Sequence, residues 1–270
     1  MKKNFKLLLC LFILLGSLMS VSAKTEYRLD YYRNAYLEFQ IPEGYHVSES
    51  GDDHWIYLEN GNWNEDITVH YSPTGAGDPW NVTPAVEIVR LEPFKMGNYV
   101  WGGLDALLES GEHDLILTAD VEYSQVAVMT LLSLDDPALQ TVMQTMIVHD
   151  GIETPDWLAI DKRGNLVINL NKEDRTDKWF FDGSYSVGDV TYLGPKTKTT
   201  GTTQTEVYGF KGNGACYLSF IYASHLKKFD RVTASVTVKV ENGKVVAILD
   251  AELNKSKRNT LIPSLELKNN

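Results

Sequence analysis

The sequence contains very little cysteine: two residues in 270, Cys10 and Cys216. Cys10 lies in a leader-like segment at the N-terminus, so a chain without that segment keeps one cysteine and cannot form an intrachain disulfide. Stability must then come from burial of apolar side chains, and about 250 residues are enough for two domains. Cys216 has the parity of Leu218 and Phe220 in an alternating segment, so we expect a buried thiol and not a nucleophile.

Long apolar runs are also missing. The longest, Leu7–Leu15, is too short for a stable membrane span. It follows three lysines within the first six residues and precedes the small residues Val21-Ser22-Ala23, which predicts a secretory signal peptide over residues 1–23. A lipid anchor on Cys10 is the alternative. We therefore expect an exported bacterial protein, periplasmic or extracellular.

Basic residues are scarce in the first half of the chain. Residues 24–154 contain 23 acidic and 5 basic side chains, whereas residues 155–270 contain 13 acidic and 17 basic ones. The acidic half argues against nucleic-acid binding, which needs a basic surface, and is typical of a soluble exported protein. The change of sign, together with Gly151 and Pro155, predicts a boundary between a domain over 24–152 and another over 153–270.

Patterns that carry catalysis or bind metals are missing as well. The histidines are scattered, with no H-E-x-x-H pair, no G-x-S-x-G elbow and no glycine loop between a strand and a helix. Asp52-Asp53 and Asp135-Asp136 are typical of turn and cap positions, with calcium binding as the alternative. We therefore expect no enzyme, no cofactor and no metal site.

The first half alternates short strand patterns with two helical ones. Strands are predicted at 36–42, 54–58, 66–71, 104–108, 114–118 and 125–132, and helices at 82–94 and 136–146. This order, with Phe39–Tyr45, Gly102–Leu107 and the end of the last helix at Met146-Ile-Val, resembles the PsbP-like superfamily. The resemblance covers about 120 residues and implies an α+β domain, an α/β/α sandwich, without implying an activity.

The second half carries strand patterns without a helical period. Cys216, Leu218, Phe220 and Tyr222 alternate after a Gly-Asn-Gly turn, and the alternation resumes from Val232 to Val240. Asn242-Gly243 is the preferred pair for the tight turn of a hairpin. About seven strands are expected in all, which predicts an all-β sandwich for 153–270.

Several intervals in this half form a regular frame. Leu170 precedes the first loop, Gly201 stands nine residues before Phe210, and Leu218 lies four residues after Gly214 and four before Tyr222. This spacing resembles that of the chagasin-type inhibitors of papain-like cysteine peptidases. The likeness covers about 90 residues. It implies an immunoglobulin-like sandwich whose three loops dock, without chemistry, on either side of the catalytic cysteine of a peptidase.

The loop motifs of that family are replaced in this chain. Its N-P-T-T-G-Y loop corresponds to Glu173–Lys178, which matches only Thr176, and its G-x-G-G loop to Gly201–Gln204, which matches only the first glycine. Ala223–Leu226 stands where the family has R-R-P-W. The resemblance places the peptidase-binding residues in these three loops: Asp174, Arg175, Thr176, Asp177, Gly201, Thr203, Gln204, Ser224, His225 and Leu226.

Two functions remain open from the sequence. The first is an exported, non-enzymatic binding protein that inhibits a cysteine peptidase reversibly through the C-terminal loops. The alternative is a cell-envelope or secreted module that binds a protein or a glycan on the same scaffold. Both predict a partner that is neither nucleic acid nor a membrane spanned by this chain, and both require the three loops to lie at one end of the sandwich.

Overall fold

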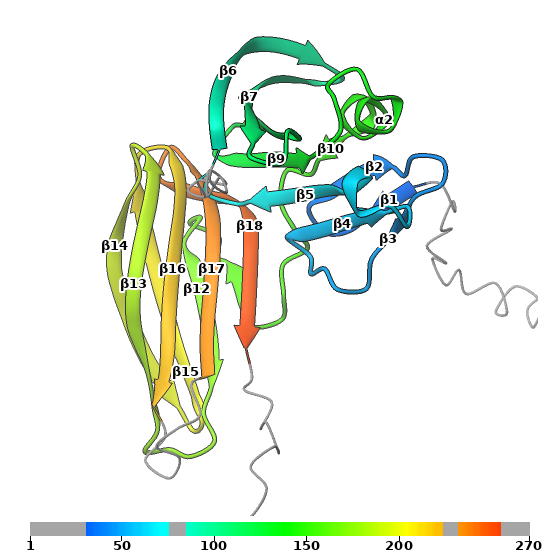
Figure 1. The fold of residues 1–270 in the computed structure, drawn as a ribbon. Helices are drawn as coiled ribbons and strands as arrows, with labels where there is room; N and C mark the ends of the chain where they lie inside the picture. The colour runs from blue at the N-terminus through cyan, green and yellow to red at the C-terminus, as the bar shows by residue number, and fades with distance from the viewer. Residues whose placement is uncertain (1–30, 76–84, 224–231, 255–270) are drawn as a thin grey trace, which may run out of the picture.

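The computed structural model describes residues 31–75, 85–223 and 232–254, and in these residues the protein is mostly β-sheet (Figure 1). The predicted signal peptide lies outside the described residues. Those of the first half form a seven-stranded antiparallel sheet in the order β3-β4-β5-β9-β8-β7-β6 and a three-stranded sheet in the order β1-β2-β10. The strands are β1 (Tyr31–Arg33), β2 (Leu37–Gln40), β3 (His46–Val47), β4 (Trp55–Glu59), β5 (Ile67–Ser72), β6 (Ala85–Met96), β7 (Tyr99–Leu108), β8 (His113–Val121), β9 (Ser124–Thr130) and β10 (Ile147–Val148).

One α-helix, α2 (Pro137–Thr145), lies within the described ranges, and it confirms the helix expected over 136–146. The carboxylate of Asp136 accepts a hydrogen bond from the Ala138 amide at 2.8 Å, and Pro137 occupies the first turn, where its missing N–H costs nothing. Leu139, Val142 and Met143 are fully buried against β2 and the large sheet. A short 3-10 turn, η1 (Trp63–Glu65), precedes β5.

The helix expected over 82–94 is wrong for the described residues 85–94, which belong to strand β6. Val86, Ile88 and Val89 are β-branched and favour a strand, and apolar spacing alone does not separate a short helix from a strand. β6 pairs with β7 in a long hairpin that arches over toward α2 (Figure 1). Helical layers on both faces of a sheet, as in an α/β/α sandwich, are not formed by residues 31–75 and 85–152.

The residues after Pro155 form two four-stranded antiparallel sheets. Their strand orders are β11-β12-β15-β14 and β13-β16-β17-β18. Inward side chains of both sheets share one core, with Ile168 and Tyr208 from the first sheet and Leu218, Phe220 and Val236 from the second. The expected β-sandwich is therefore present. Its strands are β11 (Leu158–Ile160), β12 (Leu166–Asn171), β13 (Lys178–Gly188), β14 (Thr191–Thr200), β15 (Thr203–Lys211), β16 (Gly214–Ala223), β17 (Val232–Glu241) and β18 (Lys244–Asn254).

The alternation predicted for the long strands matches the burial of their side chains. Cys216, Leu218 and Phe220 are fully buried, and Tyr222 is 8% exposed. Asn242 and Gly243 have φ values of 52° and 76°, the left-handed conformation that both central residues of a type I′ hairpin turn require. Burial also raises the pKa of the Cys216 thiol, in keeping with a packing role.

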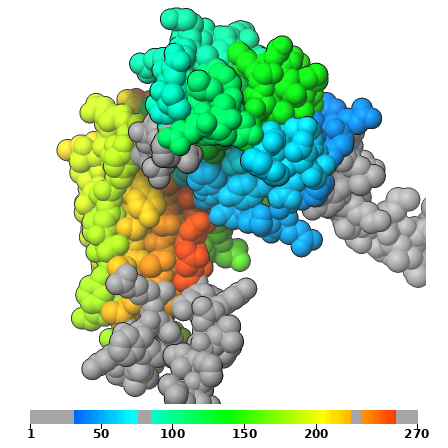
Figure 2. Space-filling model, viewed as in Figure 1, coloured from blue at the N-terminus to red at the C-terminus, as the bar shows by residue number. Residues whose placement is uncertain are grey.

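The two halves of the chain touch along β18 and near the end of β17. The Tyr36 hydroxyl donates to Asp250 at 2.7 Å, the Ile152 amide donates to the Ile248 carbonyl at 2.8 Å, and Lys239 pairs with Glu122. In the space-filling view the first half rests against the upper part of the sandwich and leaves its lower end uncovered by described residues (Figure 2). The domain boundary expected at 152–153 stays a prediction.

Candidate binding loops of the β-sandwich

The first two predicted loops lie at one end of the sandwich, the lower end in Figure 1. The last residue of β12, Asn171, is opposite Thr203 at the start of β15, so the loop 172–177 and the turn 201–202 are neighbours. The Lys172 amide donates to the Thr202 carbonyl at 2.7 Å. Lys178 at the start of β13 is opposite Ala223 at the end of β16, so the ends of β16 and β17 that flank the third loop lie at the same pole.

The loop 172–177 is held by its own polar groups. The Lys172 ammonium, whose residue is 8% exposed, donates to the Arg175 carbonyl at 2.9 Å. Asp174 accepts from both the amide and the hydroxyl of Thr176 at 2.8 Å. Such contacts fix the backbone before any partner arrives, which lowers the entropic cost of binding.

Asp177 of this loop is one of the predicted contact residues, but its side chain is buried and makes hydrogen bonds within the protein. The residue is 1% exposed. Its carboxylate accepts hydrogen bonds from the Tyr222 hydroxyl at 2.5 Å and from the Asp174 amide at 3.1 Å. The same Tyr222 oxygen accepts from the Glu173 amide at 2.7 Å. Burial, and then the Asp177 carboxylate, raise the pKa of Tyr222 to about 12, so the phenol stays a donor over the whole physiological range.

Gln204 is also turned inward, at 6% exposure. Its side chain accepts from the Trp179 amide at 3.1 Å and donates to the Trp179 carbonyl at 2.9 Å, and so it joins β15 of one sheet to β13 of the other. It also donates to Glu206, which accepts from the Tyr208 hydroxyl at 2.8 Å. The inward direction of Gln204 could have been predicted from the alternation of the strand. Gln204 and Glu206 occupy the same face of β15 as the buried Tyr208 and Phe210.

The remaining predicted residues divide into two groups. Arg175, Thr176 and Gly201 are exposed at the loop end, while Asp174 and Thr203 are half-buried; the Thr203 hydroxyl donates to Asn171 at 3.1 Å. Ser224, His225 and Leu226 lie outside the described residues. Glu173 and Thr202 are exposed beside Arg175 and Gly201 and were not predicted as contacts.

The described residues contain no group of three or more His, Cys, Asp or Glu side chains placed to hold a metal ion. None of their helices has the length and apolarity needed to cross a membrane. The described part of the loop end offers a preformed surface with the Arg175 guanidinium, the Glu173 carboxylate and small polar side chains such as Thr176 and Thr202.

No protein-family model matches this sequence, and no curated protein matches it significantly.

Proposed function

We propose that this protein is an exported, non-enzymatic binding protein that docks a protein partner on the loop end of its C-terminal sandwich. The observation that carries the proposal is the bonded pair of loops, 172–177 and 201–202, which present Arg175 and Thr176 on a backbone fixed by buried Lys172 and Asp177. A rigid sandwich with preformed loops binds at a lower ordering cost than flexible segments do.

The scaffold itself supports an immunoglobulin-like assignment. With β11 to β17 taken as strands A to G, the two sheets have the orders A-B-E-D and C-F-G, with β18 added beside G. That is the order of constant-type immunoglobulin domains. It is the topology that the chagasin-type resemblance implies, and it favours a reversible inhibitor of a papain-like cysteine peptidase as the first function to test. The PsbP-like assignment of residues 24–152 has weaker support, because β6 replaces one of its helices.

The alternative is a secreted or cell-envelope module that binds a protein or a glycan beside the loops. One observation favours it: Phe180 and Tyr185 on edge strand β13 are 53% and 50% exposed. Opposite them on β16 lie Ile221 and Tyr217, so an aromatic strip runs along this sheet from the loop end. Exposed aromatic side chains are enriched in binding surfaces.

Two substitution pairs separate these functions. Changing Arg175 and Thr176 together to alanine is expected to weaken inhibition of a sensitive papain-like peptidase at least tenfold, because both side chains project from the fixed loop. Stability should fall by about 1 kcal/mol or less, since both residues are exposed and the Thr176 hydroxyl loses its hydrogen bond to Asp174. Steady-state inhibition by the full chain and urea unfolding measure the two effects.

The matched control is Phe180→Ala with Tyr185→Ala, which alters the aromatic strip and leaves the loops intact. If the strip variant loses binding and the loop variant keeps it, the loop proposal is wrong and the strip is the docking surface. No inhibition of a broad peptidase panel by micromolar protein would exclude the inhibitor function while leaving the binding module to be tested by affinity capture.

A further inference from the structure

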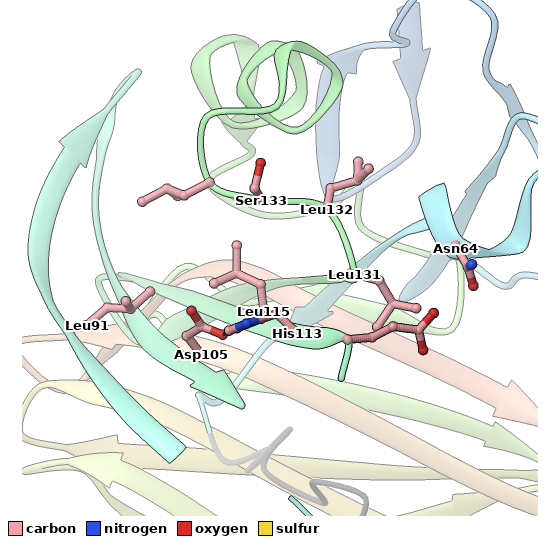
Figure 3. Close-up of a pocket in the computed structure, with 10 residues that line it drawn as sticks. Asn64, Leu91, Asp105, His113, Leu115, Leu131, Leu132 and Ser133 are labelled. Atoms are coloured by element: carbon pink, nitrogen blue, oxygen red, sulfur yellow. The ribbon is translucent and has the colours of Figure 1, made fainter. Parts of the chain in front are cut away.

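The first half of the chain contains a pocket that the proposed function does not use. Its volume is about 460 Å³, within the range of small-molecule sites. It lies between strands β6 to β8 and residues 131–134 of the segment that leads from β9 to α2, and Asn64 of η1 also lines it (Figure 3). The turn of the β6–β7 hairpin closes against α2, where a Cβ added at Gly97 would lie 2.6 Å from the Gln144 carbonyl. The turn of the hairpin therefore lies directly against the backbone of α2.

The walls of this pocket, the leucine pocket, are apolar. Leu115 of β8 forms the floor at 4% exposure, Leu91 of β6 forms one side, and three half-buried leucines come from the segment before α2 (Figure 3). The half-buried leucines come from two separate elements, β6 and the segment before α2, and would lose further apolar area to a ligand in the pocket, at about 25 cal/mol for each Å² covered. The three half-buried leucines of the segment before α2 are Leu131, Leu132 and Leu134.

The polar groups that β7, β8 and the turn between them give to the leucine pocket are mainly acidic. Asp105 of β7 and His113 of β8 lie on adjacent strands, with 2.7 Å between the carboxylate and Nδ1. Glu112 precedes His113 and accepts from the Ser110 hydroxyl at 2.9 Å. Of the described residues that line the pocket, none is lysine or arginine, and the nearby Arg90 lines a different pocket with Leu104.

We propose that the leucine pocket binds an amphipathic cation, a small molecule with an aliphatic body and a protonated amine as its head. The leucines cover the body, and the ammonium group donates to a carboxylate on the β7–β8 side of the pocket, that of Glu112 or that of Asp105. An anionic amphipath of the same shape would bring its charge beside two carboxylates, of which only Asp105 is paired with a basic group, His113, and this is unfavourable. This site is independent of the loop end and does not rest on peptidase binding.

Calorimetric titration of the full chain at pH 7.5 with octylammonium, octanol and octanoate tests the proposal, because the three ligands share one chain length. Octylammonium should bind saturably at one site, and octanol and octanoate more weakly. Glu112→Gln should weaken octylammonium binding about threefold, the effect of losing one partly exposed ion pair. The matched control, Glu109→Gln, removes an exposed charge from the same β7–β8 turn outside the lining and should leave affinity unchanged.

The double variant Asp105→Asn, Glu112→Gln should reduce the preference for octylammonium over octanol to less than twofold while binding of octanol persists, which separates lost charge from lost fold. Equal binding of octanoate and octylammonium would overturn the proposal. So would equal effects of the Glu112 and Glu109 variants, or no binding of octylammonium at millimolar concentration.

Discussion

Asp177→Ala is expected to lower the free energy of unfolding by about 3 kcal/mol. Its carboxylate is 1% exposed and accepts from the Tyr222 hydroxyl and the Asp174 amide. Alanine removes the acceptor while both donors stay in the folded loop, and each buried donor that loses its partner costs about 1–3 kcal/mol. Urea unfolding of the full chain, followed by tryptophan fluorescence, measures the loss, since Trp179 lies two residues away in β13.

The matched control for this change is Thr202→Ala, an exposed side chain in the adjacent turn. It should change stability by less than about 0.5 kcal/mol. Tyr222→Phe should fall between the two, because it removes one donor to Asp177 and the acceptor of the Glu173 amide but keeps the packed ring. Equal stability of the Asp177 and Thr202 variants would show that the carboxylate does not brace the loop.

A variant at Asp177 also tests how the loop end would bind. If the fixed backbone is what favours a partner, Asp177→Ala should weaken binding although the residue is buried and cannot itself reach a partner. An intact affinity in a destabilised variant would mean that Arg175 and Thr176 act without preorganisation. The two measurements together therefore distinguish support of the loop from direct contact.

The sandwich was largely predictable because its signals are local. Alternation places Cys216, Leu218 and Phe220 on one face, and Asn242-Gly243 specifies the hairpin turn. Strand β6 was not predictable in the same way. Its apolar residues fit a helical spacing, and the pairing with β7 that decides between the two structures is a tertiary contact.

The positions of the first two candidate loops could be predicted from the sequence, but the inward directions of two of their side chains were not predicted. Alignment to a family frame put Asp177 and Gln204 in binding loops, and polar residues in loops are ordinarily assumed to face solvent. Both instead supply internal hydrogen bonds, since a buried backbone or phenol group must find a partner within the protein. The contact between Tyr36 and Asp250 spans 214 residues, and no local pattern predicts such a pair.

That long-range contact leads to the second large effect, a dependence of stability on pH. Asp250 accepts from Tyr36 at 2.7 Å and lies 3.5 Å from Nε2 of His54, a distance suited to an ion pair and too long for a strong hydrogen bond. The His54 ring is 4.7 Å from that of Tyr36. These side chains join β18 of the sandwich to the bends that precede β2 and β4 in the first half, so their charge state bears on how firmly the halves hold together.

The two pKa values move in opposite directions. The interaction with Asp250 raises the pKa of His54, with Glu252 and Asp52 acting in the same sense and burial opposing them. Burial acts to raise the pKa of Asp250, but His54 and Tyr36 outweigh it and the pKa is lowered. Stability from the raised imidazole is complete below about pH 6.5 and is lost as pH rises through its folded pKa. Stability from the carboxylate is complete above about pH 4 and is lost on acidification.

The pair should therefore contribute most between about pH 4 and pH 6.5. His70 opposes this trend, because burial lowers its pKa to about 4 and a neutral buried imidazole destabilises the fold as pH falls below about 6.5. The pH dependence of the stability of the natural chain therefore contains opposing contributions from His54 and His70. His54 also lowers the pKa of His70, so His54→Phe relieves that repulsion whether residue 250 is Asp or Asn, and a double-mutant cycle with His54→Phe and Asp250→Asn cancels this contribution.

In that cycle we expect a coupling of about 2 kcal/mol at pH 5.5, because the His54 and Asp250 side chains are only 20% and 8% exposed. At pH 9 the coupling should fall below about 0.5 kcal/mol, where the imidazole is neutral. Phenylalanine keeps the ring contact with Tyr36, so the cycle reports charge and not packing. A coupling that stays constant from pH 5.5 to pH 9 would mean that His54 joins the halves as an aromatic ring alone, and that the two parts of the chain are not linked by its protonation.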